Sequence, residues 1–168
     1  MDPILKLLAI VGTIETAILL IAGIWAVILW MRGITPALFR LGNGLAKRQI
    51  AIFAKSQNMS SIKDLLLDSK LFKAKNISEI TQVGDIGKAE GATMYLVYWH
   101  DWVDNIDQIL QQKPDKCALI VYAPYNLGRI SDERMKNLDG QRHTAVTNFR
   151  GRLLNDIVSS MITTSYEK

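Results

Sequence analysis

The chain has 168 residues, enough for one domain of common size after an apolar N-terminal run is set aside. Its net charge of +4 comes from the N-terminal part: residues 1–63 hold seven Lys and Arg against two acids, whereas residues 64–168 hold thirteen against fourteen. A nucleic-acid-binding domain would carry its basic excess on the folded part, so no nucleic-acid partner is expected. The single cysteine, Cys117, excludes a disulfide framework and a cysteine-based zinc site.

Residues 7–31 form an apolar run that is long enough for a transmembrane helix, which needs about 20 residues. The run ends without the small-residue cleavage site of a signal peptide, which predicts a permanent anchor over residues 1–31. One cation precedes the run and four follow it, namely Lys6 and then Arg32, Arg40, Lys47 and Arg48. Because cations are retained on the inner side, we expect a single-pass protein of the cell inner membrane, with the N-terminus outside and the C-terminal domain cytosolic.

Glu15 is the only charged residue within this run. On a helical wheel it shares one side with a stripe of mostly small residues, which includes Gly12, Thr16, Ala22, Gly23 and Ala26. Small residues at three- and four-residue steps let membrane helices approach closely, and a carboxyl in hydrocarbon must be protonated, paired or hydrated. We expect the stripe to associate with another copy of the chain or with another membrane protein. The alternative is a helix hydrophobic enough to tolerate one carboxyl.

Residues 32–48 form a basic junction that contains Pro36 and the cluster Gly42-Asn43-Gly44. We expect a short interfacial helix whose Arg40 and Lys47 meet anionic lipid headgroups, followed by a break at the glycines. The alternative is a plain linker.

From residue 49 onward, short apolar runs alternate with helical periodicity, which predicts strands over residues 49–54, 77–80, 93–99, 117–123 and 143–148. Unbroken apolar runs are typical of parallel strands that are covered on both faces. Helices are expected after Ser60 or Ser61, after Asp101 and after Ser131 as caps, and from Phe149 onward. The prediction is an α/β domain over residues 49–168, with three layers and a five-stranded, mainly parallel sheet in the flavodoxin-like order 2-1-3-4-5.

In such a sheet, ligands bind at the carboxyl ends of the strands, near the point where the strand order reverses. The residues expected there offer cations, amides, a carboxylate and a phenol, which suit a phosphate- or ribose-bearing ligand. They are Lys55, Ser56, His100, Asp101, Tyr125, Asn126, Asn148 and Arg150.

Several of these residues also have a structural interpretation. Asp101 directly precedes an amphipathic stretch, which favours a helix cap over a general base. His100 lies beside two tryptophans, which is typical of a packed, hydrogen-bonded residue rather than a proton carrier. Arg150 can bind an anion or only pair with a nearby acid. The stretch "PYNLGRISDER" (124–134) is long for a loop in this fold, and is interpreted as a lid, a partner surface or an ordinary turn.

The sequence contains no Walker A, G-x-G-x-x-G, H-E-x-x-H or G-x-S-x-G pattern. With two histidines and one cysteine, we expect no metal site, and no cofactor is expected either. Response-regulator receivers and TIR domains share the five-strand plan, but this chain lacks the acidic pocket of the first and the catalytic glutamate of the second. No family and no catalytic residue are therefore assigned.

These features favour a membrane-anchored sensor or effector. Its cytosolic domain would bind a small, nucleotide-like ligand or a protein partner, and its transmembrane helix would oligomerise, with membrane permeabilisation in a stress or antiviral response as one output. One alternative is a membrane-tethered enzyme acting on a nucleotide or phosphoester. Another is an accessory subunit of a larger membrane complex.

Overall fold

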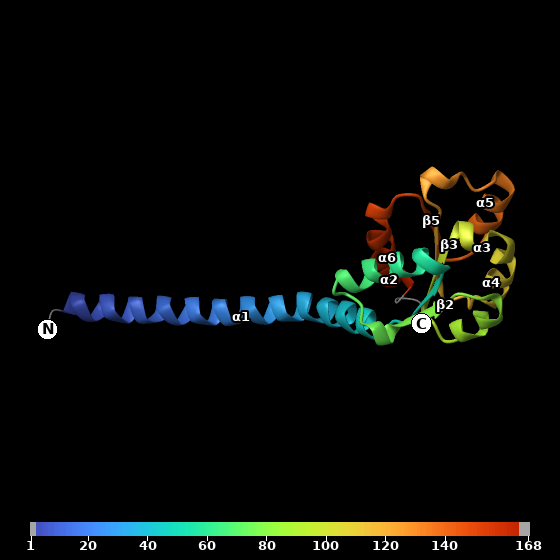
Figure 1. Cartoon of the computed structure of the whole chain (residues 1–168). Helices are drawn as coiled ribbons and strands as arrows, with labels where there is room; N and C mark the ends of the chain where they lie inside the picture. Colours follow the sequence, from blue (N-terminus) through green and yellow to red (C-terminus); the bar gives the residue numbers. More distant parts are fainter. Residues whose placement is uncertain (1–2, 165–168) are drawn as a thin grey trace. The chain divides into compact units, whose positions relative to one another are not determined.

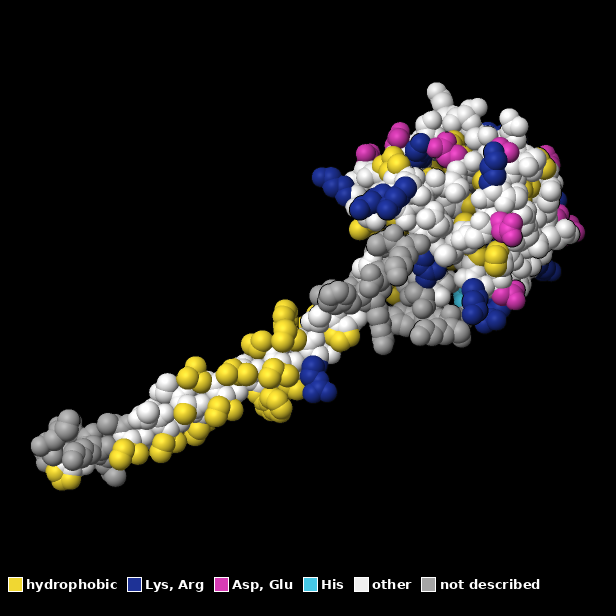
Figure 2. All heavy atoms as spheres, turned by 90° about the horizontal axis from the view of Figure 1, so that it is seen from below, with side chains coloured by type: hydrophobic (Ala, Val, Ile, Leu, Met, Phe, Trp, Pro, Cys, Tyr) yellow, Lys and Arg dark blue, Asp and Glu magenta, His cyan; other side chains and the backbone are white. Residues whose placement is uncertain are grey.

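The computed structural model describes residues 3–164, without the side chains of residues 4–9, 37–41 and 43–47. The chain divides into two compact units, Met1–Gly42 and Asn43–Lys168. Helix α1 (Pro3–Lys47) contains a stretch, Ile10–Pro36, that is long and apolar enough to span a membrane. Figure 2 shows hydrophobic side chains along this helix. The finer division into an anchor, a linker and a domain stays a prediction.

Helix α1 passes through two features that predicted an interruption. Pro36 lies inside the helix, and the backbone stays helical through Gly42-Asn43-Gly44 to Lys47. The expected break at the glycines is therefore wrong. Extending a formed helix adds one hydrogen bond for each residue that is ordered, and here this outweighs the weak propensity of glycine. The lipid contacts expected of Arg40 and Lys47 lie outside the described side chains.

The stripe around Glu15 is exposed along α1. Thr16 Oγ1 donates a hydrogen bond to the carbonyl oxygen of Gly12 at 2.7 Å, so the polar hydroxyl is satisfied within its own helix. Apart from the neighbouring backbone of the helix itself, no atom of the described residues lies within 4 Å of where a Cβ would stand on Gly12 or Gly23. The small-residue face is therefore open at both glycines.

The second unit holds a five-stranded parallel sheet in the order β2-β1-β3-β4-β5, which confirms the predicted fold class and strand order (Figure 1). The strands are β1 (Ile50–Phe53), β2 (Ile77–Ile80), β3 (Met94–Tyr98), β4 (Ala118–Tyr122) and β5 (Thr144–Thr147). Every residue of β1, β3 and β4 is buried. This explains why those strands read as unbroken apolar runs, since both faces of the sheet are covered.

Helices cover both faces of the sheet. One apolar cluster joins the sheet to α2 (Ser56–Asp68) and α6 (Arg150–Thr164). The cluster on the other face joins it to four helical segments: the 3-10 helix η2 (Val83–Ala89), α3 (Trp99–Trp102), α4 (Ile106–Gln112) and α5 (Asp132–Asp139). Three further 3-10 segments are η1 (Ala74–Asn76), η3 (Val103–Asn105) and η4 (Tyr125–Leu127).

Some helix boundaries differ from the predicted ones. The first helix of the domain begins at Ser56, before the expected Ser60 or Ser61. Ser131 does cap α5 as predicted, because its side chain accepts a hydrogen bond from the Arg134 amide. Phe149 was expected in the buried stripe of the last helix, but it precedes α6 and is 61% exposed, because the chain is still turning away from β5 at that point.

A buried lysine and a buried thiol lie just before β4. The Lys113 ammonium donates hydrogen bonds to the carbonyl oxygens of Pro114, Cys117 and Arg142. Burial lowers the pKa of Lys113 and raises the pKa of the Cys117 thiol to about 12. The predicted place of Cys117 in a buried strand region is confirmed, and its thiol is protonated at neutral pH.

Candidate functional site

Asp101 ties the ends of two neighbouring strands together. Its carboxylate accepts hydrogen bonds from the Lys55 amide at 2.7 Å and from the Asn58 side-chain nitrogen at 3.1 Å to each oxygen. Because β1 and β3 are adjacent and the strand order reverses between them, their carboxyl ends lie side by side at the switch point. The structure thus brings Asp101 and Lys55 together, as the topology predicted.

The expected role of Asp101 as the cap of the helix after it is wrong. Helix α3 begins before it, at Trp99, with Tyr98 at the capping position and no side-chain cap. The carboxylate instead serves the start of α2, where Lys55 is the residue that precedes the first helical turn.

Lys55 and Ser56 shape this edge in different ways. The Lys55 ammonium lies 5.7 Å from the centre of the Trp102 ring. This cation–π contact keeps the charge of Lys55 beside the end of α3. Ser56 has a φ of 44°, a left-handed conformation that is uncommon for a residue with a side chain. Such strained positions concentrate at functional sites, and this one lies at the switch point.

His100 lies on α3 and is half-buried. Its ring is 6.3 Å from the Tyr98 ring, and its Nε2 atom is buried without a hydrogen-bond partner among the described residues. The same holds for Nε1 of Trp102. His100 is therefore packed, as its structural interpretation predicts, but its Nε2 atom lacks the hydrogen bond that this interpretation includes.

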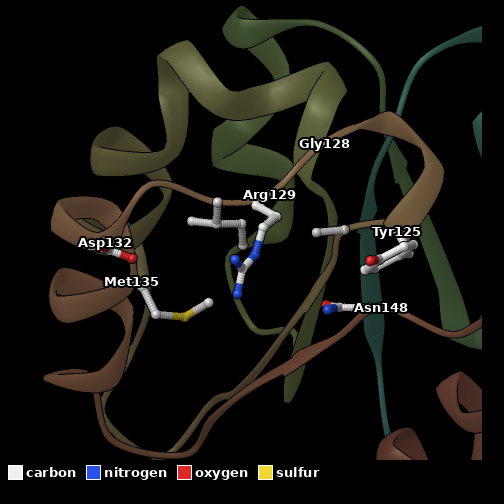
Figure 3. A pocket seen from close by; sticks show the side chains of 8 residues that line it. Tyr125, Gly128, Arg129, Asp132, Met135 and Asn148 are labelled. Carbon is white, nitrogen blue, oxygen red and sulfur yellow. The ribbon is translucent and has the colours of Figure 1, made fainter.

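Two pockets at this end of the sheet are lined by residues that the structure describes, and the larger of them has a volume of about 460 Å³, within the range of small-molecule sites. Figure 3 shows the Arg129 side chain extending into it between two groups of residues, with Asp132 and Met135 of α5 on one side and Tyr125 and Asn148 on the other. Arg129 follows Gly128, whose φ of 107° is a conformation that favours glycine. The predicted candidates Tyr125 and Asn148 thus share one pocket.

A smaller pocket of about 200 Å³ lies over the ends of β3 and β4. It holds the other two predicted candidates, Asn126 and Arg150, together with Tyr98 and Tyr122. Arg150 is fixed by Ser61, whose hydroxyl and carbonyl oxygens accept hydrogen bonds from its two terminal nitrogens at 2.7 and 2.9 Å. The eight candidates are therefore distributed over the Asp101 junction and two pockets.

The sequence-based choice of residues missed three that shape these pockets: Tyr98, Tyr122 and Arg129. Arg129 lies within the long loop that was already noted, where it is the one cation before Ser131. Tyr98 and Tyr122 were interpreted as buried strand residues. Their position could have identified them, because each is the last residue of a central strand and carries a hydroxyl at the edge where ligands bind.

The described residues contain no group of three or more His, Cys, Asp or Glu side chains arranged to hold a metal ion. Comparisons with protein-family models, curated proteins and solved structures found no match to this chain.

The Asp101 junction can be tested by stability measurements. Asp101→Ala is expected to lower the free energy of unfolding by about 1–3 kcal/mol, because it leaves the Lys55 amide and the Asn58 side chain without their acceptor. Urea unfolding of the full chain in detergent measures the change. Asp104→Ala, which removes an exposed acid from η3, is the matched control. Equal losses in the two variants would contradict the assignment.

Proposed function

We propose that this chain is a single-pass membrane sensor whose α/β domain binds a small phosphate-bearing, nucleotide-like ligand in the larger pocket. Its transmembrane helix associates through the Glu15 stripe, so that the response to ligand binding is oligomerisation of the chain. The observation that carries the proposal is the Arg129 guanidinium within a pocket of about 460 Å³ at the carboxyl edge of the sheet.

The groups around Arg129 suit different parts of such a ligand. A guanidinium matches the oxygens of a phosphate with two parallel hydrogen bonds. Tyr125 is 72% exposed and offers a ring on which a base can stack, while Asp132 can accept hydrogen bonds from ribose hydroxyls. Asn148 adds an amide that can both donate and accept.

The enzyme alternative has less support, because the best acid–base candidate is already engaged. Asp101 accepts hydrogen bonds from Lys55 and Asn58, and it does not line the larger pocket. A general base must reach the proton that it removes, at about 2.6–3.2 Å or through one water. The geometry therefore supports binding better than turnover.

Association through α1 is proposed from the character of its exposed face. The face combines an uncovered carboxyl at Glu15 with open space at Gly12 and Gly23. The Thr16 hydroxyl bonds back to Gly12, so it leaves no unpaired donor in hydrocarbon. A closely packed partner helix would bury the small residues and would shield the Glu15 carboxyl from the lipid.

Ligand binding is tested with Arg129→Ala. We expect the full chain in detergent to bind AMP or ATP, and the variant to bind it about 10- to 100-fold more weakly, because a charge-assisted hydrogen-bond pair is lost. Isothermal titration calorimetry measures both affinities. Arg152→Ala is the matched control, since Arg152 is an exposed cation at the start of α6 that lines neither pocket. Equal affinities in the two variants, or no nucleotide binding to the wild type, would refute the proposal. Nucleotide turnover that disappears in Asp101→Asn would instead support the enzyme.

Assembly is tested with Gly12→Leu and Glu15→Gln. Both are expected to reduce the oligomer to smaller species in detergent, because the first adds bulk to the contact face and the second removes the ionisable group. Size-exclusion chromatography with light scattering gives the mass. Ala17→Leu makes a similar change on the opposite side of the helix and should leave the mass unchanged. Unaltered mass in both test variants would exclude association through this face, and a second membrane protein copurifying in fixed ratio would favour the accessory subunit.

A further inference from the structure

The smaller pocket is built around two tyrosines at the ends of adjacent strands. Tyr98 ends β3 and Tyr122 ends β4, and the two are direct partners in the parallel register. Their rings meet edge to face, with centroids 5.6 Å apart and planes at 78°. Each side chain leaves the sheet on the face covered by α2 and α6, and both line the pocket.

No described residue forms a hydrogen bond with either tyrosine hydroxyl, and neither oxygen is among the fully buried atoms that lack a partner. Both hydroxyls are therefore accessible from the pocket, although each residue is only 7% exposed. A buried tyrosine normally places its hydroxyl against an acceptor, as Tyr95 does against the Ala89 carbonyl. The pKa of Tyr98 is raised, first by burial and then by the Asp101 carboxylate, so its hydroxyl stays protonated and can donate. The hydroxyls of Tyr98 and Tyr122 therefore line the pocket as two hydrogen-bond donors that a ligand can use.

A fixed cation completes the pocket. The two hydrogen bonds from Arg150 to Ser61 use two of the five N–H donors of a guanidinium within the described residues, and they hold the group in place. Arg150 begins α6, and Asn58 and Ser61 lie in the first turns of α2, so two helix N-termini add partial positive charge. The nearby carboxylate of Asp101 does not line the pocket and is engaged with Lys55 and Asn58.

We propose that the smaller pocket binds a single phosphate group, held by the hydroxyls of Tyr98 and Tyr122 and by the guanidinium of Arg150. At about 200 Å³ the pocket is below the size of a whole small-molecule site, but it has room for one anionic group. This inference goes beyond the proposed function, because the pocket uses different residues from the Arg129 pocket. The phosphate belongs either to a soluble ion or ester or to a lipid headgroup.

The test removes one hydroxyl at a time from the full chain in detergent. Inorganic phosphate and glycerol 3-phosphate, which has the chemistry of a lipid headgroup, are titrated separately by calorimetry. We expect Tyr98→Phe and Tyr122→Phe each to weaken binding about tenfold or more, because each loses a hydrogen bond to a charged group. Tyr95→Phe is the matched control and should bind as the wild type does, because Tyr95 lines neither pocket and its hydroxyl bonds to the Ala89 carbonyl. The ratio of the two wild-type affinities separates the two sources of phosphate.

Folding and binding are separated within the same variants. Because neither hydroxyl has a hydrogen-bond partner in the part of the chain that the structure describes, Tyr98→Phe and Tyr122→Phe should melt no lower than the wild type without phosphate. No binding of either phosphate at millimolar concentration, or equal affinities in all three Tyr→Phe variants, would overturn the inference. Phosphate binding that disappears in Arg129→Ala but persists in Tyr98→Phe and Tyr122→Phe would also overturn it, while leaving the proposed function intact.

Discussion

Trp102→Ala is expected to lower the free energy of unfolding of the α/β domain by about 3–5 kcal/mol, the usual range for removing a buried aromatic side chain. Trp102 is fully buried, and its ring packs edge-on against Phe53 of β1 at 5.5 Å between centroids. Lys55 lies over the same ring. The indole therefore connects α3 to the carboxyl end of β1, and its loss opens a cavity beside Phe53 and Lys55.

Trp102→Phe separates the loss of packing from the loss of the indole nitrogen. Because Nε1 of Trp102 has no partner among the described residues, removing it also removes an unsatisfied buried donor. We expect this variant to be clearly more stable than Trp102→Ala. Urea unfolding of the full chain in detergent, followed by near-UV circular dichroism, measures both changes. Trp30→Ala, which alters an exposed side chain of α1, is the control. A loss below about 1 kcal/mol in Trp102→Ala would contradict the assigned packing.

The second large effect is a loss of stability at alkaline pH that originates at Cys117. Burial raises the pKa of its thiol from 9.0 to about 12 in the folded chain. Between these values the folded chain holds a proton that the unfolded chain releases, so stability falls as the pH rises. Since each pKa unit corresponds to about 1.4 kcal/mol, the thiol accounts for a fall of about 2 kcal/mol between pH 9 and 11.

Comparison with Cys117→Ala isolates this contribution. Tyr95, whose pKa is also raised to about 12, acts in the same direction, while the lowered pKa of Lys113 acts in the opposite one. Both groups remain in the variant, so the difference in slope between the two chains reports the thiol together with its influence on the pKa values of Tyr95 and Lys113. We expect the stability of Cys117→Ala to fall less steeply over this range, as measured by urea unfolding at each pH. Parallel slopes would show that the thiol is not buried as described.

The elements of the domain were largely predictable because their signals are local. The run Ala118–Tyr122 is apolar at every position, which is the pattern of a strand covered on both faces. Ser131 caps α5 as expected. A cap of this kind needs only a hydroxyl three residues before the backbone amide that donates to it, and that spacing can be read from the sequence. The start of α2 at Ser56 was less predictable, because its first residue adopts a left-handed φ that the sequence does not indicate.

Local sequence patterns account for the apolar N-terminal helix and for the alternation of strands and helices, and therefore for the edge of the sheet where polar groups gather. The partners of those groups follow from the folded arrangement alone. Asp101 bonds to an amide 46 residues earlier in the chain, and Tyr98 meets Tyr122 because β3 and β4 are neighbours in register. Hydropathy and capping act over a few residues, whereas such contacts depend on which strands lie side by side and which face each side chain takes.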